Sequence, residues 1–79
     1  MKGSEQNPIW MRRSRRIAML MLSKMEELEL TQKALAQRMG CSQQYISKIF
    51  KGQENLSLET ICKIEGALSL QLLPQESET

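Results

Sequence analysis

Histidine and aspartate are both absent from this chain of 79 residues. The usual zinc ligands are cysteine and histidine, and the two cysteines, Cys41 and Cys62, do not have a metal-binding or redox spacing. No serine or cysteine stands near a plausible general base, and no glycine-rich phosphate loop occurs. We therefore expect no enzyme activity, no metal or other cofactor and no small-molecule ligand.

Long apolar runs are also missing. The longest one, residues 17–22, is far too short to span a bilayer. No small-residue cleavage site follows it, so it does not resemble a signal peptide. We expect a cytoplasmic protein with two small, reduced and inward-facing cysteines, because a disulfide between them would suit a secreted protein.

The charge is unevenly distributed along the chain. Its net value is only +2, but residues 1–52 contain ten Lys and Arg against four Glu, whereas residues 53–79 contain one Lys against five Glu. This length makes one small domain, and such domains often enlarge their core by dimerising. A basic half of this kind indicates a polyanionic partner.

Two short helices are predicted within residues 31–52. Thr31 and Ser42 are placed to cap their starts, and Gly40 and Gly52 to end them in the left-handed conformation. About three residues separate the two helices, which is the spacing of a helix-turn-helix. The segment has four Lys and Arg and no acidic residue, so its exposed face is predicted to be polar and cationic.

This segment resembles the helix-turn-helix of the lambda-repressor/Cro-like family, often called Xre-type. The matching residues are Leu30, Thr31, Gln32, Leu35, Ala36, Met39, Gly40, Ser42, Gln43, Gln44, Tyr45, Ile46, Ser47 and Gly52. Residues 55–60 resemble the loop and next helix start of the same domain, and the whole likeness extends over residues 17–68. The resemblance implies an all-α DNA-binding domain of four to five helices, which we place at residues 7–68.

The resemblance also implies which residues contact DNA. The residues expected to read bases are Gln43, Gln44, Ser47 and Lys48. A glutamine amide can bond adenine N6 and N7 together, and a lysine suits guanine O6 and N7. The residues expected to contact phosphates are Gln32, Tyr45, Lys51, Gln53, Asn55 and Ser57. From polarity alone all of these are ordinary surface residues; Tyr45 can instead pack, and Ser57 can serve only as a helix cap.

Helical spacing predicts the rest of the fold. A first helix is expected from Asn7 and Pro8, as cap and first helical residue, to about residue 28, and a fourth helix from Ser57 onwards. The expected core residues are Trp10, Ile17, Met21, Met25, Leu28, Leu35, Ala36, Met39, Ile46, Ile49, Phe50, Leu58, Ile61, Ile64 and Leu68. Four arginines at positions 12, 13, 15 and 16 form either a solvated face or a phosphate-binding one.

The two ends of the chain have different patterns. Residues 1–6 are polar and predicted to be disordered. Leu68, Leu70 and Leu72 alternate with polar residues, which predicts a short strand followed by a polar tail within residues 69–79. A lone strand needs a partner, so we expect it to pair with its copy across a dimer, with helix-one residues such as Met19 and Leu22 as the alternative contact.

Together these features predict a sequence-specific transcriptional regulator, a repressor that binds a palindromic operator in double-stranded DNA as a homodimer. The small size and the C-terminal leucines also resemble antitoxin regulators of the HigA/HipB kind, which bind their own promoter and a toxin protein. A third hypothesis is a protein–protein interaction module that does not bind DNA.

Overall fold

A computed structural model describes residues 8–74, which form four helices. They are α1 (Ile9–Leu28), α2 (Gln32–Met39), α3 (Gln43–Phe50) and α4 (Leu58–Leu68). The all-α prediction is confirmed. The predicted N-terminal tail, the capping role of Asn7 and the polar tail from residue 75 lie outside the described residues.

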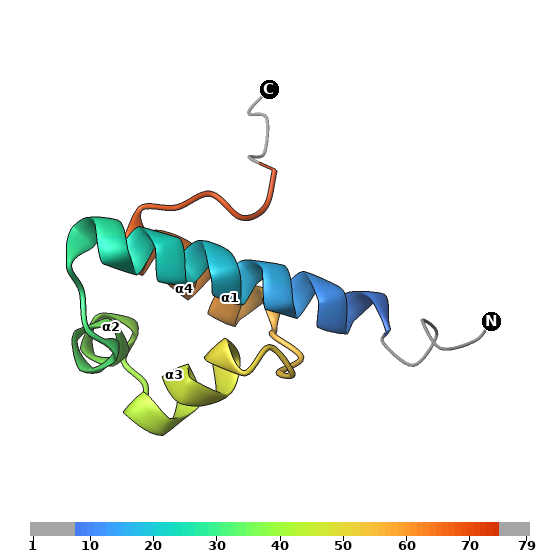
Figure 1. Cartoon of the computed structure of the whole chain (residues 1–79), viewed down its shortest axis with the longest axis horizontal. Coiled ribbons are helices and arrows are strands. Elements are labelled where there is room, and N and C mark those ends of the chain that lie inside the picture. The colour runs from blue at the N-terminus through green and yellow to red at the C-terminus, as the bar shows by residue number, and fades with distance from the viewer. Residues whose placement is uncertain (1–7, 75–79) are drawn as a thin grey trace.

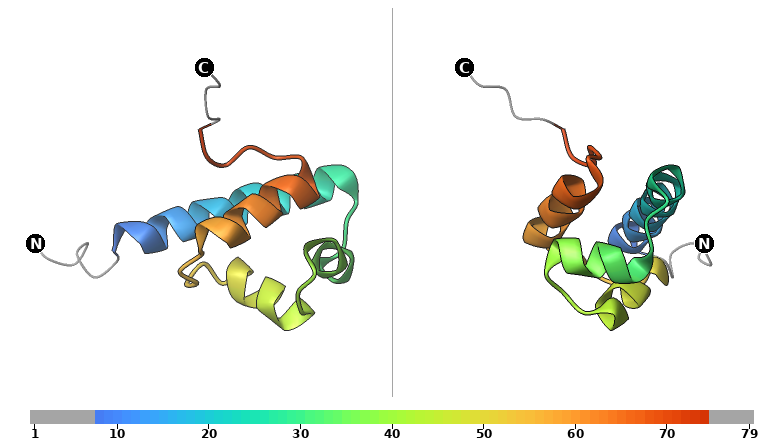
Figure 2. Two further views of the ribbon diagram at one scale, coloured as in Figure 1. Left: turned by 180° about the vertical axis from the view of Figure 1, so that it is seen from behind. Right: turned by 90° about the vertical axis from the view of Figure 1, so that its left-hand side faces the viewer.

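The helices are arranged around the long α1. Helix α4 lies beside it, α2 and α3 lie together on one side of this pair, and residues 69–74 run back over the opposite side (Figures 1 and 2). Each of α2 and α3 contacts the rest of the bundle, α2 through α4 and α3 through α1. The helix-turn-helix therefore occupies one side of the molecule, with the outer face of α3 uncovered.

Local signals in the sequence fix where the helices begin and end. The hydroxyls of Thr31, Ser42 and Ser57 each accept a hydrogen bond of 3.1 Å from the backbone N–H three residues later. Gly40 and Gly52 have φ values of 71° and 73°, a left-handed conformation that disfavours side chains. All five predicted capping roles are confirmed.

The start of α1 differs from the prediction by one residue. Pro8 is the N-cap, with φ −60° and ψ 157°, and Ile9 is the first helical residue. Its extended ψ keeps Pro8 outside the helix, although its fixed φ would suit the first turn. At the other end of α1, Glu29 adopts a left-handed conformation with φ 54°, and the N–H of Leu30 donates to the carbonyl of Met25.

The core joins all four helices. The largest fully buried side chains are Met21, Leu35, Ile46, Ile49, Ile64 and Leu68. On α1 the buried line passes through Ser14, Ala18, Met21 and Met25, so the small residues at its N-terminal end allow close packing. This core excludes water from the inner faces of α2 and α3 and holds the two helices in a fixed relation.

Four residues expected in the core lie elsewhere. Trp10 and Leu28 are 40% and 41% exposed, because α1 is 20 residues long and its ends extend beyond α3 and α4, the helices of 8 and 11 residues that contact it. Leu58 is 69% exposed and Cys62 is also exposed. These two are four residues apart, on a flank of α4 that points away from its buried line. Neither Cys41 nor Cys62 is in a disulfide.

The predicted C-terminal strand is wrong, since residues 8–74 contain no strand. The N–H groups of Leu72 and Leu73 instead donate to one carboxylate oxygen of Glu65, at 2.7 and 2.8 Å. Leu70 and Leu72 pack against the core of their own chain. The hydrogen bonds from Leu73 and then Leu72 lower the pKa of Glu65 below its ordinary value. A side chain thus satisfies the backbone donors that a strand would need to pair.

Candidate nucleic-acid interface

Helix α3 has one buried face and one open face. Ile46 and Ile49 are fully buried, so the helix cannot rotate without losing its core contacts. Gln43, Gln44 and Lys48 are exposed on the other side. Three of the four predicted base-reading side chains therefore lie together on the uncovered face, two of them on the first turn.

The fourth predicted base-reading residue, Ser47, is in a different position. It is only partly exposed, and its hydroxyl donates a hydrogen bond of 3.1 Å to Oε1 of Gln32. Gln32 is the first residue of α2, so this bond joins the two helices of the motif. It also uses the carbonyl end of the amide and leaves the –NH₂ end of Gln32 as a hydrogen-bond donor. No sequence pattern predicts this pair, because the two residues are 15 positions apart in the chain.

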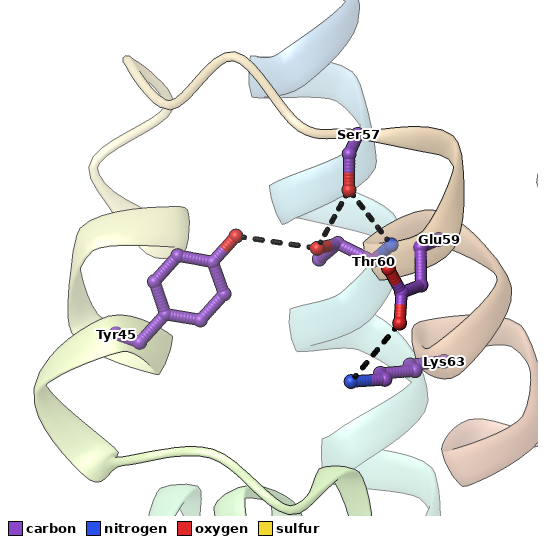
Figure 3. Close-up of polar contacts among 5 residues, drawn as sticks. All are labelled: Tyr45, Ser57, Glu59, Thr60 and Lys63. Carbon is purple, nitrogen blue, oxygen red and sulfur yellow. Dashed lines mark hydrogen bonds and ion pairs between the residues drawn. The ribbon is translucent and has the colours of Figure 1, made fainter.

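The predicted phosphate contact Tyr45 lies in a polar network between α3 and α4 (Figure 3). Its hydroxyl is 3.4 Å from the hydroxyl of Thr60, which also accepts a hydrogen bond of 3.1 Å from Ser57. Because Ser57 caps α4, the network connects the start of that helix to α3. An exposed ion pair of 3.8 Å between Glu59 and Lys63 lies beside it and adds little stability.

The other predicted phosphate contacts follow α3. Lys51 is the C-cap of the helix, and Gln53 and Asn55 lie in the irregular segment that leads to α4. All three are exposed. They extend the polar surface of α3 into the loop, so that polar side chains continue beyond the C-terminal end of the uncovered helix face.

The exposed surface of the helix-turn-helix carries a positive charge. In residues 8–74 the ion pairs involve Lys24 and Lys63, and neither belongs to the segment 31–52. Arg38, on the last turn of α2, donates a hydrogen bond of 2.9 Å to the carbonyl of Ala67 and so fastens α2 to the end of α4. Lys33, Lys48 and Lys51 remain as exposed cations.

Other kinds of site receive no support in the described part of the chain. Within residues 8–74, no group of three or more cysteine and glutamate side chains is arranged to hold a metal ion. No helix in that range combines the length and the apolar character needed to cross a membrane.

The fold and this surface define a helix-turn-helix DNA-binding domain. A family model described as helix-turn-helix, HTH_3, matches residues 21–73, which is more than half of the chain. The chain belongs to this Xre/Cro-like helix-turn-helix family, whose members bind DNA and are not enzymes. Searches of curated proteins and of solved structures gave no match.

Proposed function

We propose that the protein is a homodimeric transcriptional repressor that inserts α3 into the major groove of a palindromic operator. The observation that supports this most is the first turn of α3, where Gln43 and Gln44 are exposed next to Lys48 while the opposite face is locked in the core. Paired donors and acceptors on rigid backbone are what base-edge recognition requires. Gln43 and Gln44 bond adenine, and Lys48 bonds guanine.

Contacts with phosphates then set the position of α3 in the groove. The –NH₂ group of Gln32, left open by the bond to Ser47, donates to a phosphate at the start of α2. Lys51, Gln53 and Asn55 contact the backbone on the other side of the recognition helix. Tyr45 and Ser57, whose hydroxyls belong to the network with Thr60, act by holding α3 against α4.

A second subunit supplies the second recognition helix. One α3 reads too few base pairs to select a site, whereas two about 34 Å apart read both halves of a palindrome on one face of the duplex. Met19 and Leu22 are one helical turn apart on α1 and are 69% and 46% exposed. We assign the dimer contact to this apolar pair, because Leu70 and Leu72 pack on their own chain.

The antitoxin hypothesis has lost one of its two supports. It depended on the small size of the chain and on a C-terminal strand available for pairing, and the N–H groups of Leu72 and Leu73 are instead bound to Glu65. The hypothesis of a protein–protein interaction module does not explain why the exposed face of the motif is cationic. We therefore propose DNA as the partner of this face and a repressor as the kind of regulator.

Selection of binding sites from random duplex DNA tests the proposal. We expect an enriched site with two inverted half-sites whose centres are about 10 base pairs apart, bound by two chains per duplex in analytical ultracentrifugation. No enrichment over unselected DNA would contradict sequence-specific binding. Enrichment of one half-site with one chain per duplex would contradict the dimer and leave the recognition helix in place.

A further inference from the structure

A row of arginines on the N-terminal half of α1 has no role in the function proposed above. Arg12, Arg13, Arg15 and Arg16 are all exposed. None of them forms an ion pair with an acidic group in residues 8–74. Like charges three and four residues apart on a helix destabilise it, so this row suits a surface that meets negative charge from outside.

Gly52 places one of these arginines beside the DNA-facing loop. A Cβ atom at Gly52 would lie 2.6 Å from Cγ and 3.3 Å from Cα of Arg15. Helix α1 therefore passes in direct contact with the residue between Lys51 and Gln53, as the position of the loop beneath the N-terminal half of α1 shows (Figure 1). The stem of Arg15 packs on the loop, and its guanidinium extends to 3.9 Å from Sδ of Met11 at the exposed surface.

The helix period spreads the row around α1. Arg12 is three residues before Arg15 and lies about 60° from it around the helix, whereas Arg16 lies about 100° from it. Arg13 lies on the other side, where it lines a small hollow with Asn55, Leu56 and Ile61 next to α4. Arg15 is thus the arginine that borders Gly52, and Arg12 is the arginine nearest to it around the helix.

We infer that Arg12 and Arg15 bind phosphates of the same DNA duplex and extend the backbone contact of the loop along α1. This inference rests on the proposed function, because it takes α3 to be the element that enters the groove. The two side chains add affinity for any sequence and do not read bases. The footprint of each subunit therefore reaches beyond the base pairs that α3 touches.

Salt titrations of charge-removing variants test this inference. The variants are Arg12→Gln, Arg15→Gln and the double variant, and glutamine keeps the Cβ and Cγ of Arg15 that pack on Gly52. Lys24→Gln is the matched control, since it removes the same charge from α1 at a residue paired with Glu27 at 3.6 Å. Dissociation constants are measured from about 50 to 300 mM salt on the selected operator and on random duplex. Circular dichroism melting checks that each variant is folded.

Because both subunits of the dimer lose the contact, each arginine variant is expected to reduce the slope of log K against log salt by about 1.8, and the double variant by about 3.6. The loss is the same on both DNAs, and Lys24→Gln keeps the wild-type slope. Equal slopes for the arginine variants and Lys24→Gln overturn the inference. A wild-type protein that selects no operator contradicts the proposed function, whereas the random-duplex slopes still decide the role of Arg12 and Arg15.

Discussion

The contact between Gly52 and α1 predicts that adding one methyl group at Gly52 lowers the free energy of unfolding by a large amount. In Gly52→Ala the residue must keep a left-handed φ of 73°, which costs an L-residue about 1 to 2 kcal/mol. The new Cβ also lies 2.6 Å from Cγ and 3.3 Å from Cα of Arg15. Overpacking of this kind adds about 1 to 3 kcal/mol, so the total loss of unfolding free energy is about 2 to 5 kcal/mol.

Gly40→Ala is the matched control for the backbone cost. Gly40 has almost the same φ, 71°, but a Cβ there would meet nothing within 4 Å. This variant should therefore lose only the backbone part, about 1 to 2 kcal/mol. Urea denaturation followed by circular dichroism measures both values. In thermal melts, each kcal/mol corresponds to a decrease in Tm of about 4 to 8 °C for a domain of this size.

A double-mutant cycle separates the steric part from any other effect. Arg15→Ala removes the Cγ atom that lies closest to the new methyl group. It should recover part of the stability lost in Gly52→Ala, and none of the stability lost in Gly40→Ala. Equal losses in the two glycine variants, with no recovery by Arg15→Ala, would refute the close approach of α1 to the loop.

Three further predictions concern the C-terminal segment that is bonded to Glu65, the polar network around Tyr45 and the dimer contact. The lowered pKa of Glu65 means that its ionised form stabilises the fold above the ordinary carboxyl range, and this contribution is lost as the pH falls through the lowered pKa. Glu65→Gln should abolish that acid dependence and speed hydrogen exchange at the N–H groups of Leu72 and Leu73. Unchanged exchange would contradict the hydrogen bonds between these groups and the Glu65 carboxylate. Tyr45→Phe should lower stability by less than about 1 kcal/mol and leave the affinity for random duplex unchanged, so weaker binding of random duplex by the folded variant would restore a phosphate contact. Leu22→Glu should give monomers in light scattering without loss of helix, and a persistent dimer would exclude this surface.

Most of the fold was predictable because its signals are local. A hydroxyl residue three positions before the N–H that it caps, and a glycine just after a helix, are short-range patterns, and all five of them lie where expected. The inner positions of α2 and α3 follow from the helix period alone. The exposure of Trp10 and Leu28 was not predictable in this way, because it depends on how far the neighbouring helices reach along α1.

The C-terminal segment shows why side-chain to backbone bonds escape sequence analysis. Alternating leucines predicted a strand, but Glu65 accepts the N–H groups of residues seven and eight positions later. Nothing in composition or period marks a carboxylate for this task. The candidate site was predicted to a similar degree: the open face of α3 follows from its period, whereas the bond between Ser47 and Gln32 depends on how the two helices cross.

The most direct test of the account is the effect of Gln43→Ala and Gln44→Ala on discrimination between DNA sequences. Dissociation constants are measured at one salt concentration for the selected operator and for random duplex. The control is Gln71→Ala, which removes an exposed glutamine from the segment 69–74, and this segment runs on the opposite side of the molecule from α3 (Figure 2). For each half-site, every α3 variant should bind the operator about 5- to 150-fold more weakly, the equivalent of about 1 to 3 kcal/mol, and bind random DNA as the wild type does. Equal losses on both DNAs, or no loss on either, would contradict the assignment of α3 as the helix that reads sequence.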